Sequence, residues 1–156
     1  MSKPASKFNS PQATALIRNM EAKLSWKGDY KFEAEIGSGA SLSFDNADEG
    51  VPPIGPSPME ALLTSLAACT AMDVISILEK KRQKVHSYTV EIEGDRDPPG
   101  TWPRPFKEFR VKHRISGENI DEAAVARAIE LSESKYCSVS QTLKTTPPII
   151  NEWVIE

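Results

Sequence analysis

The chain has 156 residues, of which 19 are basic and 22 acidic, so its formal net charge at pH 7 is −3. A chain of this length forms one domain of ordinary size. No basic cluster stands out, so nucleic acid is not expected as a partner. The two cysteines, Cys69 and Cys137, are too few for a secreted disulfide framework and do not form a C-x-x-C metal pair. They are expected to be either buried structural thiols or a redox couple.

The N-terminal segment is polar. Residues 1–21 are predicted to be a polar N-terminal extension that contains a short helix within residues 10–20, and residues 22–156 to be a single domain. The extension lacks the positive, apolar and small-residue pattern of a secretory signal. We therefore expect a soluble, cytoplasmic protein.

Alternating apolar and polar residues predict strands in the first third of the domain. Residues 22–27 and 30–36 alternate on either side of Gly28-Asp29, which is typical of a β-hairpin. A third strand is expected at residues 40–45. Residues 46–56 are rich in proline, glycine and acidic side chains, so they are predicted to form a surface loop.

The most apolar run of the chain, residues 55–80, predicts the central helix. Ser57 is its expected N-cap, Pro58 fits the first helical position, and Glu60 completes an S-x-x-E capping box. Apolar residues surround most of its circumference, so we expect the helix to be buried. A membrane span is not expected, because Glu60 and Asp73 interrupt the apolar run.

The second half of the chain predicts two more strands, a helix and a last strand. Residues 85–93 and 106–116 alternate and are expected to pair antiparallel across a proline-rich loop at residues 95–105. A second helix follows Asp121 as its cap, and residues 149–155 make the last strand. The order βββ-α-ββ-α-β predicts an α+β domain in which antiparallel strands wrap around two long helices.

The two cysteines differ in their local setting. Cys69 lies in the middle of the central helix, where the helix dipole stabilises a thiolate little, and cysteines in apolar helices more often serve packing than catalysis. Cys137 lies in a polar segment; if a helix begins just after it, free N–H groups favour its thiolate. Asp73, one turn after Cys69, would raise a thiol pKa if charged and close. Both cysteines therefore remain open between structural and functional roles.

Several motifs together resemble the OsmC/Ohr family, the osmotically inducible and organic hydroperoxide resistance proteins. These are Ser57-Pro58-Met59-Glu60, then Ala67-Ala68-Cys69, and after a long gap Lys135-Tyr136-Cys137-Ser138-Val139. Residues 71–78 and 124–128 are similar in particular to the YhfA-like branch of that family. The resemblance covers roughly residue 22 to the C-terminus.

The resemblance implies an OsmC-like fold, an intertwined homodimer and a thiol-dependent reductase of organic hydroperoxides. Cys69 would match the peroxidatic cysteine that becomes a sulfenic acid, and Cys137 would match the resolving cysteine that forms a disulfide with it. An external dithiol such as dihydrolipoyl, carried by a lipoylated protein, would restore the thiols. The partners implied are a second copy of the chain and a small hydroperoxide, with no metal or other cofactor.

Two departures from the family pattern keep other functions open. Typical hydroperoxide reductases of the family use an arginine from the N-terminal strands and a glutamate directly after the motif proline. Here no arginine occurs between Lys23 and Lys81, and Met59 follows Pro58. The alternative is a non-enzymatic OsmC-like dimer that binds or carries a small ligand or a sulfur species; a third possibility is a structural dimer with inert cysteines. The candidate cations are Lys27, Arg82, Arg96 and Arg127.

Overall fold

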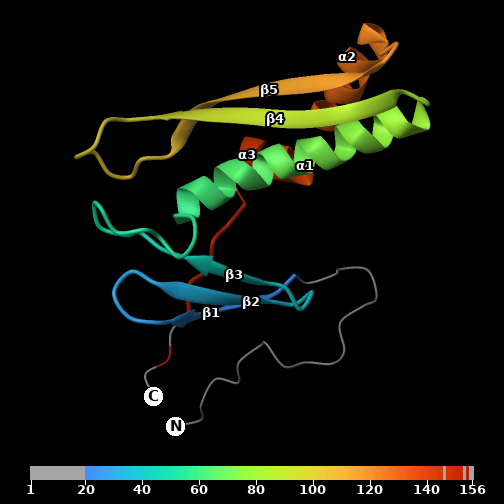
Figure 1. The fold of residues 1–156 in the computed structure, drawn as a ribbon. Coiled ribbons are helices and arrows are strands. Elements are labelled where there is room, and N and C mark those ends of the chain that lie inside the picture. The colour runs from blue at the N-terminus through green and yellow to red at the C-terminus, as the bar shows by residue number, and fades with distance from the viewer. Residues whose placement is uncertain (1–19, 146, 153, 155–156) are drawn as a thin grey trace. The chain divides into compact units, whose positions relative to one another are not determined.

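The computed structural model describes residues 20–145, 147–152 and 154 (Figure 1). The chain divides into two units, residues 1–56 and residues 57–156. The short helix predicted within residues 10–20 lies outside the described residues, apart from Met20, which is not helical.

The described part of the first unit is a three-stranded antiparallel sheet in the order β1-β2-β3. The strands are β1 (Ala22–Trp26), β2 (Phe32–Ile36) and β3 (Ser41–Phe44), which confirms the predicted hairpin and third strand. The loop after β3 is anchored by the buried Asp45, whose carboxylate accepts a hydrogen bond of 3.1 Å from the N–H of Ile54.

The second unit begins with the long helix α1 (Pro58–Lys80). Ser57 caps it as predicted: the Glu60 N–H donates to the Ser57 hydroxyl at 3.4 Å, and the Ser57 N–H donates to the Glu60 carboxylate at 2.8 Å. Hydrogen bonds from the side chain and the backbone of Ser57 hold the pKa of Glu60 below its usual value. The reciprocal bonds satisfy two donors at the start of the helix, which is why α1 begins at Pro58.

Replacing Glu60 with alanine should lower the free energy of unfolding by roughly 0.5–2 kcal/mol, the range seen for losing a helix cap. The reactivity of the Cys69 thiol should not change, because nine residues of helix place the two side chains on opposite faces of α1. A thermal melt and thiol alkylation as a function of pH, done on the same variant, measure both. Glu60→Gln keeps an oxygen acceptor for Ser57 and is the matched control. If the melting temperature stays unchanged while the pH dependence of Cys69 alkylation shifts, Glu60 belongs to the active site instead.

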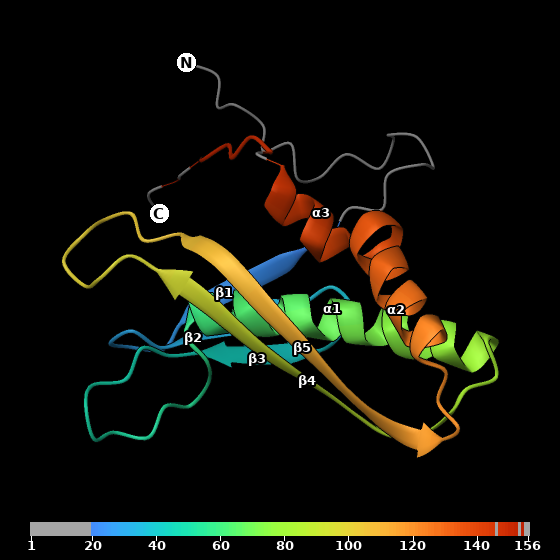
Figure 2. The same cartoon turned by 90° about the horizontal axis from the view of Figure 1, so that it is seen from above.

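A long two-stranded ribbon crosses α1 and forms the other layer of the second unit (Figure 2). It consists of β4 (Lys84–Arg96) and β5 (Phe106–Glu118), which pair antiparallel as predicted. Helix α2 (Glu122–Leu131) starts at Asp121, whose side chain accepts from the Ala123 N–H at 3.0 Å. The core lies between α1 and α2 and contains Val74, Leu78, Ala124 and Ala128.

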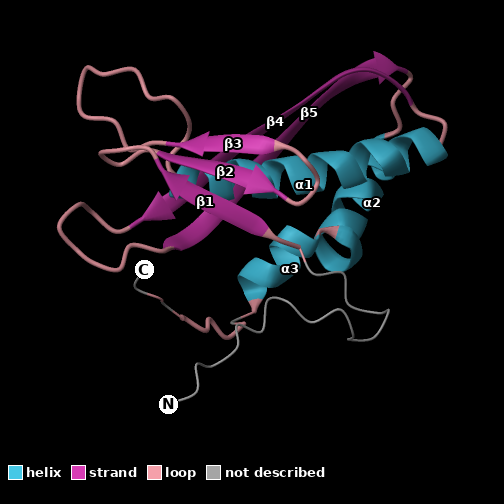
Figure 3. Ribbon diagram, turned by 90° about the horizontal axis from the view of Figure 1, so that it is seen from below, coloured by secondary structure: helices cyan, strands magenta, loops and turns pink. Residues whose placement is uncertain are grey.

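The chain leaves α2 through a π-helical turn, η1 (Ser132–Tyr136), and then starts a further helix, α3 (Ser138–Lys144) (Figure 3). A short helix thus begins just after Cys137, the possibility on which the thiolate argument depended. The described residues thus contain antiparallel strands and three α-helices, an α+β arrangement as predicted, in which α1 has 23 residues and α2 has 10.

The predicted burial of α1 on nearly all faces is wrong for the single chain. Only one stripe with helical spacing is buried, namely Leu66, Thr70, Val74 and Leu78, while Met72 is 70% exposed. By length and composition α1 could cross a membrane, but core helices of soluble proteins have the same properties, and this stripe packs against β4 and α2. Outside the stripe, Ile77 is half-buried and packs against the core, whereas Met72 lies exposed.

The strand predicted at residues 149–155 is also not formed in the part of it that the structure describes. Residues 149–152 and 154 have no strand structure, and Ile149 and Ile150 are each 85% exposed. A strand needs a neighbour for its backbone donors and acceptors. Alternation of apolar and polar residues indicates that one face of a strand would be buried, but it does not identify the neighbouring strand with which the segment would pair.

Candidate functional site

The fold brings the two cysteines together. Cys69 lies half-buried on α1, and Cys137, which is 1% exposed, lies at the junction of η1 and α3. Both are free thiols. Their sulfur atoms and a carboxylate oxygen of Asp73 all lie within 4.8 Å of one another. Residues far apart in the sequence therefore form one thiol–carboxylate cluster, consisting of Cys69, Asp73 and Cys137.

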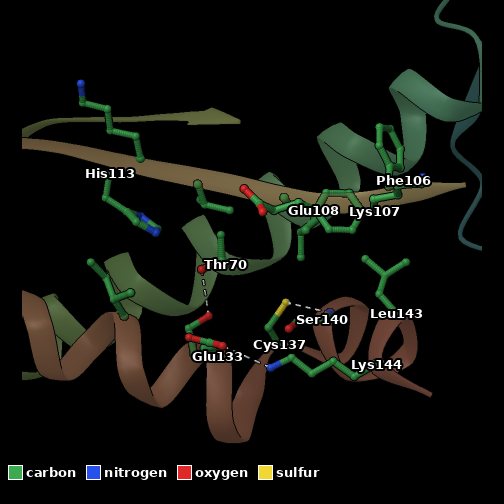
Figure 4. Close-up of a pocket in the computed structure, with 16 residues that line it drawn as sticks. Thr70, Phe106, Lys107, Glu108, His113, Glu133, Cys137, Ser140, Leu143 and Lys144 are labelled. Carbon is green, nitrogen blue, oxygen red and sulfur yellow. Dashed lines mark hydrogen bonds and ion pairs between the residues drawn. The ribbon is translucent and has the colours of Figure 1, made fainter. Parts of the chain in front are cut away.

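A buried serine fixes the junction of α2 and η1 to α1. The Ser132 hydroxyl lies 3.0 Å from both the Thr70 hydroxyl and the Asp73 carboxylate (Figure 4 shows the contact with Thr70). Because a hydroxyl carries one proton and two lone pairs, Ser132 can donate to Asp73 while it accepts from Thr70. Sequence analysis missed Thr70 and Ser132. The available signal was the polar pair Thr70 and Asp73, three residues apart on a largely apolar helix.

Burial governs the charge of Cys137. It raises the pKa of this thiol to about 11, and the hydrogen bond to Cys69 and the negative charges of Cys69 and Asp73 act in the same direction. The Ser140 N–H, which donates to the Cys137 sulfur at 3.3 Å, acts in the opposite direction. The start of α3 thus favours the thiolate as expected, but desolvation of the buried sulfur outweighs this one backbone donor, so the pKa rises. Cys137 is protonated at neutral pH.

An open pocket of about 780 Å³ lies beside Cys137 (Figure 4). This volume suits a small organic molecule. Cys137 belongs to its wall, and in Figure 4 it lies between His113 on one side and Phe106 on the other. Cys69 does not line the pocket, so the pocket touches the cysteine pair from the Cys137 side. The apolar wall consists of Leu66, Phe106, Phe109, Val111, Ile129 and Leu143, and the charged wall of Lys107, Glu108, Lys112, Glu133 and Lys144.

Gly94 makes room for one wall of the pocket. A Cβ atom at this position of β4 would lie 2.5 Å from the ring of Phe106 and 3.1 Å from the Leu63 side chain. Any residue other than glycine would therefore displace the ring that closes one side of the pocket.

His113 forms an uncharged pair with Tyr88 at another part of the pocket. Its Nδ1 lies 2.7 Å from the Tyr88 hydroxyl, and the two rings stack with centroids 5.9 Å apart. Burial lowers the pKa of His113 and raises that of Tyr88 to about 12. A neutral imidazole that accepts a hydrogen bond from the Tyr88 hydroxyl fits a structural role.

Three of the four candidate cations are engaged elsewhere. Lys27 pairs with Glu33 at 2.8 Å within the first unit, Arg127 pairs with Glu130 at 2.8 Å, and Arg96 donates to the carbonyl of Arg104. Among the described residues, no ion pair involves Asp73, and no lysine or arginine donates to either sulfur. The cysteine pair thus has a carboxylate for a neighbour.

The fold and the paired thiols define the class of protein, and comparisons with known proteins agree. A family model described as OsmC-like protein matches residues 48–152. Protein YhfA of Escherichia coli strain K12 is 34% identical over 137 residues, which cover 87% of this chain and 98% of the relative. The chain therefore belongs to the OsmC-like family, which confirms the resemblance seen in the sequence.

Solved structures show the same fold. A hypothetical protein from Aquifex aeolicus has 30% sequence identity and a TM-score of 0.71, over 82% of this chain and 89% of that chain. A Legionella pneumophila protein described as an organic hydroperoxide resistance protein OsmC has a TM-score of 0.59, over 84% of this chain and 92% of that chain. Its identity is 16%, so it supports the fold alone.

Proposed function

We propose that the protein reduces organic hydroperoxides with Cys69 as the attacking thiol and Cys137 as the resolving thiol. The observation that carries this proposal is the convergence of the two sulfur atoms within 4.8 Å in an OsmC-like fold. Cys69 is the more accessible of the two thiols, which suits it for the first attack. A cytoplasmic location, where thiols stay reduced, is part of the proposal.

The proposed catalytic cycle has three steps. The Cys69 thiolate attacks the distal oxygen of the hydroperoxide, the O–O bond breaks, and the alkoxide takes a proton to leave as an alcohol. The Cys137 sulfur then attacks the Cys69 sulfenic acid; its own proton leaves with the hydroxyl group as water, and a disulfide remains. An external dithiol, for which a dihydrolipoyl group is the candidate, returns both thiols by exchange and is itself oxidised to a disulfide.

The raised pKa of Cys137 fits the resolving role. A thiol that is protonated at neutral pH is a poor first nucleophile, because the thiolate is the reactive form. The proton on Cys137 is available to the departing hydroxyl group once the sulfenic acid has formed. The short distance between the sulfurs means that closing the disulfide needs only local movement.

Stoichiometric organic hydroperoxide should convert the two thiols of each chain into one intrachain disulfide, because their sulfur atoms already lie together. Mass spectrometry of the intact protein should show the loss of about two hydrogens per chain, and digestion should give a Cys69–Cys137 cross-linked peptide. In Cys137→Ser the same treatment should give a sulfenic acid on Cys69. Two free thiols after this treatment of the wild-type protein would refute the proposed function.

A homodimer completes the proposal. Met72 on α1 and Ile149 and Ile150 after α3 are large apolar side chains that lie exposed in the single chain. A second copy that covers them would bury more than about 2,000 Å², as obligate dimers do. Light scattering at micromolar concentration should give the mass of two chains, and a variant lacking residues 1–21 should give the same result if residues 22–156 are the folded domain. A single-chain mass would contradict the dimer.

One observation favours the alternative, a non-enzymatic dimer that binds or carries a small ligand or sulfur species. Asp73 brings negative charge to the cysteines, where hydroperoxide reductases of this family would have an arginine. A nearby carboxylate disfavours a second anion and so slows attack by a thiolate. If hydroperoxide leaves the thiols intact while the pocket beside Cys137 binds a ligand, this alternative holds.

A further inference from the structure

The thiol–carboxylate cluster has the composition and spacing of a metal site. Its three donor atoms, two sulfurs and one oxygen, all lie within 4.8 Å of one another. In a tetrahedral zinc site, with Zn–S near 2.3 Å and Zn–O near 2.0 Å, neighbouring donor atoms are about 3.5 to 3.8 Å apart. Each donor pair therefore needs to contract by no more than about 1.3 Å to hold the ion.

Two rigid elements supply the donors. Cys69 and Asp73 are four residues apart on α1, so they point from the same face of the helix on consecutive turns. Cys137 comes from the junction of η1 and α3, which the buried Ser132 fixes to α1. Two ligands four residues apart on one helix, with a third donor from another element, are a common way to build a zinc site.

Outer contacts of the donors are already present. The Ser132 hydroxyl, 3.0 Å from an Asp73 oxygen, orients the carboxylate, and the Ser140 N–H donates to the Cys137 sulfur at 3.3 Å. Partners of this kind orient metal ligands and raise metal affinity. They hold the side chains close to the geometry that a bound ion requires.

The charge of the cluster favours a cation. Each of the three groups is negative when it loses its proton, and within the described part of the chain no salt bridge brings a lysine or arginine to Asp73. A divalent metal ion displaces the protons of thiol ligands when it binds. Sulfur ligands select zinc over magnesium or calcium, which prefer oxygen alone.

We propose that in the reduced protein Cys69, Asp73 and Cys137 bind one Zn²⁺ ion through two thiolates and one carboxylate. Binding releases the two thiol protons to solvent. The inference goes beyond the proposed peroxidase function, since it assigns a second state to the same sulfurs. If both hold, one hydroperoxide and two protons convert the bound thiolates into a disulfide, an alcohol and water, and the Zn²⁺ ion is released.

Cobalt serves as the spectroscopic probe. The reduced, metal-free full-length chain is titrated with Co²⁺ under argon, and the thiolate-to-cobalt charge-transfer band in the near-ultraviolet is followed. We expect the band to saturate at one Co²⁺ per chain and to vanish when Zn²⁺ is added. A pH-indicator assay of the Zn²⁺ titration should show the release of about two protons per ion.

Variants identify the ligands. Asp73→Asn should keep the band but weaken Zn²⁺ binding by about tenfold or more, whereas Cys69→Ser should lose a large part of the band intensity. Glu79→Gln, at an exposed carboxylate near the end of α1, is the matched control and should bind as the wild type does. Circular dichroism checks the fold of each variant; if Asp73→Asn does not fold, Cys69→Ser carries the test.

The outcomes separate this inference from the proposed function. A folded, reduced wild-type protein that gives no charge-transfer band overturns the metal site, and so does a band that Cys69→Ser leaves unchanged. Disulfide formation is measured separately, in metal-free protein treated with hydroperoxide. Disulfide formation without metal binding would refute only the Zn²⁺ site. Metal binding without disulfide formation would refute only the proposed reduction of hydroperoxides.

Discussion

Cys69→Ser should reduce the rate of hydroperoxide reduction to the uncatalysed background, while Cys137→Ser should still consume one equivalent of hydroperoxide per chain. Serine has no accessible anion at neutral pH, so the first variant lacks the nucleophile. The second retains the attacking thiol but cannot close the disulfide, so its Cys69 stops as a sulfenic acid. The measurement is cumene hydroperoxide consumption with a dithiol reductant, together with trapping of the sulfenic acid by a dimedone probe.

The control for these variants is Thr101→Ser, which changes an exposed hydroxyl side chain in the loop between β4 and β5. It should reduce hydroperoxide at the wild-type rate. Turnover by Cys69→Ser at the wild-type rate would exclude Cys69 as the nucleophile. Turnover by Cys137→Ser at that rate, with no accumulation of sulfenic acid, would show that the disulfide is not part of the cycle.

Local chemistry made several elements predictable from the sequence. The capping box of Ser57 and Glu60 requires only residues three positions apart, and both of its hydrogen bonds form. The hairpin of β1 and β2 follows from Gly28-Asp29, both of which have positive φ in the turn. Alternating apolar and polar residues likewise indicated that two neighbouring segments form strands, and these pair as β4 and β5.

The parts of the site that depend on distant residues could not be predicted. Nothing near Ser132 in the sequence indicates that its hydroxyl meets Thr70 and Asp73 on another helix. The helix expected to begin just after Cys137 pointed to a stabilised thiolate, but the packing of η1 against α1 buries this thiol, and burial raises its pKa. Family resemblance identified the two cysteines as a pair, whereas only the structure shows that Asp73 lies close to both sulfurs.

The same limit applies to the metal proposal. The sequence predicted no metal because the two cysteines match no zinc motif in their spacing. Cys69 and Asp73 have a helical ligand spacing, but this is common on any helix and gains meaning only when Cys137 reaches it. A site assembled from one helix face and a distant helix junction has no compact signature in the sequence.

Leu78→Ala should lower the free energy of unfolding by about 2–5 kcal/mol, which is a large part of the 5–15 kcal/mol typical of a domain. Leu78 is 0% exposed and contacts Val74, Ala124 and Ala128 in the core between α1 and α2. The alanines opposite are too small to fill the space that the leucine leaves, so a cavity remains and adds to the lost transfer free energy. Urea unfolding followed by circular dichroism measures the change.

Met72→Ala is the matched comparison, because it truncates a large apolar side chain on the exposed face of the same helix. In a single chain this change should cost less than about 0.5 kcal/mol. In the proposed homodimer it should cost more and lower the unfolding midpoint further on dilution, since dimer stability depends on protein concentration. The loss of unfolding free energy caused by Leu78→Ala should be the same at every protein concentration, because Leu78 packs within its own chain. A loss below about 1 kcal/mol for Leu78→Ala would contradict the observed core.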